Sequence, residues 1–140
     1  MPLRITASAL AVILAAPAAQ AQIRPSVFES ESDYADFVNR SVMSRDFVPL
    51  VRMLGGDDEY TDQQLASVNQ SLLNAFPSDF EETAVIKRVE LMNGFVQEAR
   101  AFWTGAQYGW FYALLHDTGS EYIVINFSLN TDVSVILDKF

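Results

Sequence analysis

The chain has 140 residues, 50% of them hydrophobic, and carries 18 acidic against nine basic side chains, a net charge of −9. It contains no cysteine, which excludes disulfides, thiol catalysis and zinc sites built from thiolates. A charge this negative is repelled by phosphate backbones and by anionic lipid headgroups, so we expect no nucleic-acid partner and no binding to a membrane surface.

The first 21 residues predict a secretory signal peptide. Arg4 precedes an apolar run from Ala7 to Pro17, and Ala19 and Ala21 place small residues where a signal peptidase cleaves. The run is shorter than the roughly 20 residues that a membrane span needs, and no later segment predicts a membrane anchor. The pattern is typical of bacterial export signals. We therefore expect cleavage after Ala21, a periplasmic or secreted protein, and a single domain over residues 22–140.

Residues 30–76 predict three helices that are apolar on one side only. The second ends at Gly55-Gly56, and Thr61 with Gln64 forms a capping box that opens the third. The apolar positions recur at three- and four-residue spacing: Tyr34, Phe37, Val38 and Val42, then Phe47, Leu50, Val51 and Leu54, then Leu65, Val68, Leu72, Leu73 and Phe76. The acidic loop from Gly55 to Asp62 lacks the spacing of a calcium-binding loop, so we interpret it as a solvated turn and expect no metal.

The stretch from Ala84 to Leu129 predicts four strands joined by tight turns, an antiparallel meander. Asn93-Gly94 favours a two-residue turn, which would place Met92 opposite Phe95 and Arg88 opposite Ala99. The two later turns would pair Trp103 with Tyr108 and His116 with Glu121.

These registers divide the strands into two faces. The face expected to lie under the helices carries Ala84, Ile86, Met92, Phe95, Trp103, Tyr108, Trp110, Tyr112, Leu114, Ile123, Ile125, Phe127 and Leu129. The opposite, partly exposed face carries Lys87, Glu98 and Arg100 together with an apolar patch that includes Phe102, Phe111, Tyr122 and Val124. Such a patch is typical of a partner or dimer interface, although the terminal helix or residues 23–28 could also cover it.

Three polar residues fall on the predicted core face. Arg88, Glu90 and Gln97 meet there, beside Trp110 and Tyr112, and a buried charge is costly unless it is paired. One interpretation is a solvated flank of the sheet with an ordinary Arg–Glu pair. The other is a ligand pocket between helices and sheet that is lined by these five residues.

Two further segments leave alternatives open. His116 lies at a hairpin end, without a nucleophile that would make it catalytic, so a half-exposed histidine that pairs with Glu121 is the simpler interpretation. Thr131 can cap a short terminal helix over Val133 to Phe140, for which a fifth strand is the competing interpretation.

The order of elements predicts an α+β domain, with N-terminal helices packed on one face of a four-stranded antiparallel meander and a short C-terminal helix. This layout resembles the small cystatin-like and NTF2-like α+β folds. The resemblance implies a conical pocket, which some members use for isomerase or dehydratase chemistry and others only for binding or dimerisation. Their acid–base pairs have no counterpart in this sequence.

Two functional hypotheses follow. The first is an exported, non-catalytic binding domain that needs no cofactor and engages a protein partner, a small apolar ligand or a second copy of itself. The second is a small isomerase or hydratase in which Glu90 is the base and Arg88, Tyr112 or Gln97 positions the substrate.

Overall fold

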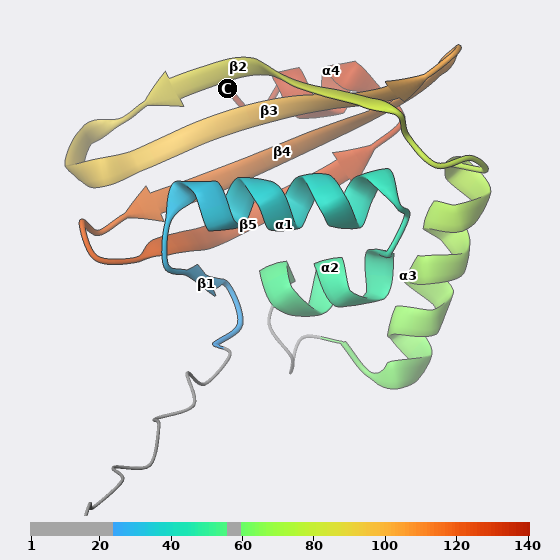
Figure 1. Ribbon diagram of the computed structural model, residues 1–140, viewed down its shortest axis with the longest axis horizontal. Helices are drawn as coiled ribbons and strands as arrows, with labels where there is room; N and C mark the ends of the chain where they lie inside the picture. The colour runs from blue at the N-terminus through green and yellow to red at the C-terminus, as the bar shows by residue number, and fades with distance from the viewer. Residues whose placement is uncertain (1–23, 56–59) are drawn as a thin grey trace, which may run out of the picture.

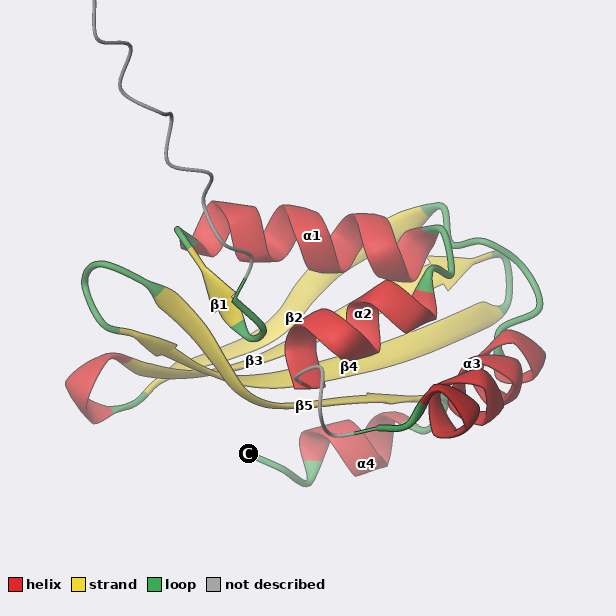
Figure 2. Cartoon of the chain, turned by 90° about the horizontal axis from the view of Figure 1, so that it is seen from below, coloured by secondary structure: helices red, strands yellow, loops and turns green. Residues whose placement is uncertain are grey.

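The computed structural model describes residues 24–55 and 60–140, in which a curved antiparallel sheet carries helices on both faces. Figure 2 shows α1 and α2 over one face of the sheet, α4 on the other face, and α3 at one end of the strands. The fold class predicted from the sequence, α+β, is confirmed. The predicted signal peptide and residues 56–59 of the acidic loop lie outside the described residues.

The three N-terminal helices form where apolar periodicity and capping residues predict them. They are α1 (Glu31–Met43), α2 (Phe47–Gly55) and α3 (Asp62–Ala75). The Ser30 side chain accepts a hydrogen bond from the Asp33 amide at the start of α1, and Thr61 and Gln64 make the predicted capping box of α3. In α2 the four predicted apolar positions are all buried, whereas in α3 only Leu65 is. Hence α3 packs less completely than its neighbours.

The sheet has five strands rather than four. The predicted meander consists of β2 (Glu82–Glu90), β3 (Phe95–Thr104), β4 (Gln107–Asp117) and β5 (Tyr122–Asn130). A two-residue strand, β1 (Val27–Phe28), pairs antiparallel with β5 and gives the sheet order β1-β5-β4-β3-β2. Its shortness explains why no periodic signal in the sequence marks it.

Two of the three predicted turn registers are wrong. Asn93 and Gly94 do take positive φ angles of 60° and 83°, but they belong to a three-residue turn, η1 (Met92–Gly94), so Arg88 pairs with Glu98 instead of Ala99. The last turn is wider than predicted, because Asp117 pairs with Tyr122. The pair of Trp103 with Tyr108 is confirmed.

The predicted core face is wrong for most of the sheet, because α1 and α2 pack against the other side of β3 and β4. Phe127 and Leu129, which follow the irregularity in β5, do pack against the main core as predicted. The face under these helices contributes buried residues to the main core: Val96, Phe102, Phe111, Ala113, Leu115, Tyr122 and Val124. Residues assigned to the core face include some that are largely exposed: Ile86, Met92, Tyr108 and Ile125. Both faces are apolar because both are covered, so the count of large apolar residues does not identify the main core.

The smaller second core lies under α4 (Val133–Leu137), and the predicted terminal helix is confirmed over these five residues. Its cap is Asp132 rather than Thr131, since the Asp132 carboxylate accepts hydrogen bonds from the Ser134 hydroxyl and amide, which lower the pKa of that carboxyl. Ile136 packs against Ala99 and Tyr112. A five-residue helix thus covers the face that carries both tryptophans.

Candidate functional site

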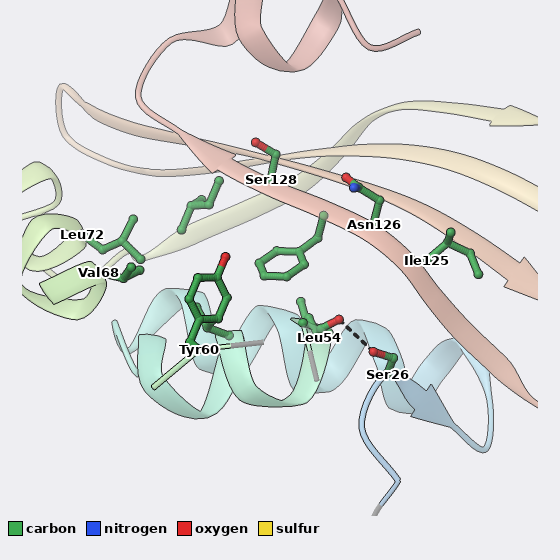
Figure 3. Close-up of a pocket in the computed structure, with 12 residues that line it drawn as sticks. Ser26, Leu54, Tyr60, Val68, Leu72, Ile125, Asn126 and Ser128 are labelled. Atoms are coloured by element: carbon green, nitrogen blue, oxygen red, sulfur yellow. Dashed lines mark hydrogen bonds between the residues drawn. The ribbon is translucent and has the colours of Figure 1, made fainter. Parts of the chain in front are cut away.

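An opening between the two layers lies where α2, α3 and β5 diverge. It is a groove of about 430 Å³, and none of the described residues that line it is charged. We call it the inter-layer groove; it is lined by Ser26, Val51, Leu54, Gly55, Tyr60, Val68, Leu72, Ile125, Asn126, Phe127, Ser128 and Leu129. Figure 3 shows it as the space between the strand β5 and the helix α2.

The groove exists because α3 does not close onto the sheet. Val68 and Leu72 of α3 are only half-buried, although both lie on the apolar side of that helix. Phe127 and Leu129 of β5 are likewise half-buried, while Val51 and Leu54 of α2 are fully buried beneath them. The groove therefore combines apolar side chains with polar and backbone atoms, and the polar atoms form the larger part of its exposed lining.

Tyr60 and Ser26 add polar groups to this groove. Tyr60 precedes α3, is 36% exposed, and lies between α2 and β5 with its hydroxyl directed toward the strand (Figure 3). The Ser26 hydroxyl donates a hydrogen bond of 2.9 Å to the Leu54 carbonyl and so ties the start of β1 to α2. A second, shallower depression of about 610 Å³ adjoins the groove and shares Tyr60 and Val68 with it. A lining that combines apolar side chains with hydrogen-bonding groups is typical of binding sites for small molecules and peptides.

A second candidate is a buried ion cluster between α1 and β3. Glu98 is 1% and Arg100 6% exposed, and Arg100 Nε lies 2.5 Å from Glu98 Oε1. Arg100 also donates to Asn39 Oδ1 at 3.1 Å, and Arg88 bridges Glu98, at 3.5 Å, to Glu31 at the surface. Neither cavity described above includes any of these residues. Through Glu31 and Asn39 the cluster connects α1 to the sheet.

Two tyrosines border this cluster. The rings of Tyr34 and Tyr122 lie 5.5 Å apart, and within the described part of the chain neither buried hydroxyl has a hydrogen-bond partner. Burial, reinforced by the charge of Glu98, raises the pKa of Tyr34 well above its usual value. Burial and the charge of Glu31 raise the pKa of Tyr122 to about 12. Both phenols are therefore protonated at neutral pH.

The five residues of the predicted ligand pocket lie on two faces of the sheet. Arg88 pairs with Glu98 and lies on the helix side, and Glu90 is exposed at the end of β2 on that same side. Gln97 lies on the α4 side, where its amide donates to the Tyr112 hydroxyl at 3.1 Å and to the Lys139 carbonyl at 2.9 Å.

The α4 side around Gln97 is filled by the C-terminus of the chain. The rings of Tyr112 and Phe140 meet edge to face at 5.4 Å, and Trp110 stacks on Tyr108 at 5.7 Å. Gln97, Trp110 and Tyr112 therefore hold α4 and the residues after it against the sheet, and the predicted group of five is not brought together.

The predicted exposed interaction surface is interior, so this prediction is wrong. Phe102 and Phe111 are 0% exposed, Tyr122 2% and Val124 3%. The N-terminal segment accounts for part of the cover, as one alternative foresaw, because Phe28 of β1 belongs to the same core. Most of the cover comes from α1 and α2.

His116 makes contacts that stabilise the β2–β3 turn. Its ring stacks on Phe95 with centroids 4.0 Å apart, and its Nε2 lies 3.0 Å from the Asn93 carbonyl oxygen. The predicted partner, Glu121, forms an ion pair with Arg24 instead. Through these two contacts His116, at the end of β4, packs against the β2–β3 turn.

The inter-layer groove was not predicted, although two weak signals in the sequence point to it. The apolar stripe of α3 is interrupted by the polar residue Asn69, four residues after Leu65, which indicates a helix that is packed on only part of its length. The run from Ile123 to Asn130 contains no charge. Neither signal locates the groove until the helices are placed on the sheet.

Within residues 24–55 and 60–140, no cluster of acidic or histidine side chains could hold a metal ion, and no helix is long and apolar enough to cross a membrane. Comparison of the chain with known protein families, with characterised proteins and with solved structures found no match.

Proposed function

We propose that this protein is an exported, non-catalytic binding domain that holds an apolar group of its ligand in the inter-layer groove. The observation that carries the proposal is the groove itself: about 430 Å³ between α2, α3 and β5, with several apolar side chains and no charged side chain among its described lining residues. Export is proposed on the pattern of the first 21 residues, with periplasmic or extracellular space as the destination.

The chemistry of the groove favours binding over catalysis. General acid–base catalysis needs a titratable group within reach of a bound substrate. Among the described lining residues the polar side chains are the hydroxyls of Tyr60, Ser26 and Ser128 and the amide of Asn126. These groups can orient a ligand by hydrogen bonds, and no carboxylate or imidazole is among them.

The geometry gives no support to the alternative of an isomerase or hydratase. Glu90, its base, is exposed, and Gln97 and Tyr112 lie on the opposite face of the sheet from Glu90 and Arg88. Of the three residues expected to position the substrate, only Arg88 shares a face with Glu90, and Arg88 forms ion pairs with Glu31 and Glu98.

An uncharged fluorescent probe tests the binding function. We expect N-phenylnaphthylamine to bind the folded protein with enhanced emission, and the variant Val68→Trp, which fills the groove from α3, to weaken that binding by about ten-fold or more. Val135→Trp is the matched control, because Val135 is an exposed helical valine on the far side of the sheet. Equal probe binding by both variants, with both folded by circular dichroism, would refute the groove as the binding site.

A further inference from the structure

The outer edge of β5 is only partly used. β1 pairs with Tyr122 and Ile123, and the Ser26 carbonyl accepts a hydrogen bond of 2.8 Å from the Val124 amide. From Ile125 to Asn130 no strand of the described part of the chain pairs with this edge. In an antiparallel strand, alternate residues direct their N–H and C=O groups to each side, so these six residues present unpaired backbone groups over about 20 Å.

This edge lacks the features that protect the other edge of the sheet. β2, the opposite edge strand, carries Lys87, Arg88 and Glu90 and has an irregularity at Ile86, all of which discourage the addition of another strand. The open part of β5, residues 125–130, has no charge and no proline. Nothing in residues 125–130 therefore opposes the pairing of a further strand with this edge.

The open edge borders the inter-layer groove. Residues 125–129 of β5 all line the groove, and Val68 and Leu72 of α3 lie across from them (Figure 3). A compact apolar molecule in the groove would exclude water from the edge while leaving its N–H and C=O groups without partners, which is unfavourable. An extended peptide satisfies these backbone groups and also supplies alternate side chains to the groove.

The position of β1 and the net charge of the chain indicate how this peptide lies and what charge it carries. A strand antiparallel to β5 would lie in line with β1, which already occupies the same edge next to it. The chain carries a net charge of −9, so its long-range field attracts basic segments and repels acidic ones.

We propose that an extended, basic peptide segment of another protein adds as a strand to residues 125–130 of β5, in line with β1, and inserts alternate apolar side chains into the inter-layer groove. This inference rests on the function proposed above and names the class of ligand that the groove takes. Affinity comes from the backbone pairing, and selectivity comes from the apolar side chains and the positive charge.

Amide hydrogen exchange, followed by NMR, tests the strand addition. The probe is a seven-residue peptide of alternating lysine and valine with blocked ends. We expect it to slow exchange at amides within residues 125–130 by at least about ten-fold at saturation, and to leave the β2 edge, residues 82–90, unchanged. Protection at β2 alone, or at neither edge in spite of binding, would overturn the proposal.

Two control peptides separate backbone pairing from other forms of attraction. The same peptide with N-methylated amides on one edge keeps its side chains and charge but loses the donors, so we expect it to bind at least about ten-fold more weakly. A peptide of alternating glutamate and valine should also bind more weakly, with the difference shrinking at high salt. Equal affinity of the methylated and unmethylated peptides would overturn strand addition.

Three outcomes distinguish this inference from the proposed function. If the uncharged probe binds in the groove but the lysine–valine peptide does not bind, the binding function stands and strand addition is overturned. If neither binds, both proposals fail. If the protein alone sediments as a dimer in which the amides of residues 125–130 are already protected, a second copy occupies the edge and the peptide proposal is overturned.

Discussion

At the scale of single residues, the main departure from a conventional core is the ion pair between Glu98 and Arg100. These residues are neighbours on one face of β3, and both are buried beneath α1. The sequence analysis placed them on a partly exposed face, because charged residues are rarely buried. Glu98 and Arg100 neutralise each other, and Arg88 and Asn39 add further contacts that make their burial tolerable. Arg88 and Asn39 are both distant from the pair in the sequence.

We predict that the pair is strongly coupled. Glu98→Gln or Arg100→Met alone leaves an uncompensated buried charge and should lower the free energy of unfolding by about 3–5 kcal/mol. The double variant Glu98→Gln/Arg100→Met removes both charges and should cost less than the two single changes added together. Urea denaturation followed by tryptophan fluorescence measures all three. Additive losses would show that the two side chains do not interact in the folded protein.

At the scale of elements, the helices were predictable because their signals are local. The apolar spacing of α1 and α2, the Thr61–Gln64 capping box and the prolines and glycines that end the segments all act within a few residues. The sheet faces were not predictable in the same way. One extra residue in the β2–β3 turn and the irregularities at Ile86 and Ile125 each reverse which side of the sheet the following residues face.

The β2–β3 turn also packs against the end of β4, which predicts a difference between two glycines. Gly94 and Gly119 both have positive φ, at 83° and 89°. A Cβ on Gly94 would lie 2.2 Å from the Asp117 carbonyl oxygen, whereas a Cβ on Gly119 would meet nothing within 4 Å. Gly119→Ala should therefore cost only about 1–2 kcal/mol for its left-handed backbone.

Gly94→Ala should cost clearly more than Gly119→Ala, because the clash with backbone adds to the same conformational strain. Thermal unfolding of the two variants side by side gives the comparison. Equal melting temperatures would mean that the turn does not pack on β4 as described, and the contact of His116 with Asn93 would then also be in doubt.

At the scale of the whole molecule, the inter-layer groove results from the way α2 and α3 pack beside β5. The stripe of α3 predicted a packed helix, yet only Leu65 and the cap residue Phe76 became buried, because β5 and α2 diverge beside it. A sequence shows that a helix has an apolar side but not how far that side closes on its partner. For this reason the candidate site could not be predicted, although most of the elements that build it could.

The close contact of α1 with the sheet predicts how the stability of the whole molecule responds to high pH. Tyr34 and Tyr122 bury their hydroxyls where these layers meet, and the pKa of Tyr122 rises to about 12 in the folded protein. In the unfolded chain the pKa of tyrosine is about 10. A raised folded pKa means that the folded protein holds its protons more tightly, so the stabilisation is complete below about pH 10 and is lost as the pH rises toward about 12.

The free energy of unfolding should therefore fall between about pH 10 and pH 12, with a slope of up to about 1.4 kcal/mol per pH unit from each buried tyrosine. Tyr122→Phe removes one of the two groups and should make the decline shallower. Tyr108→Phe is the matched control, because Tyr108 is 48% exposed, and it should leave the decline unchanged. Urea denaturation at a series of pH values measures the slope. An identical decline in the wild type and in Tyr122→Phe would show that the Tyr122 hydroxyl is open to solvent, and the docking of α1 over β5 would have to be revised.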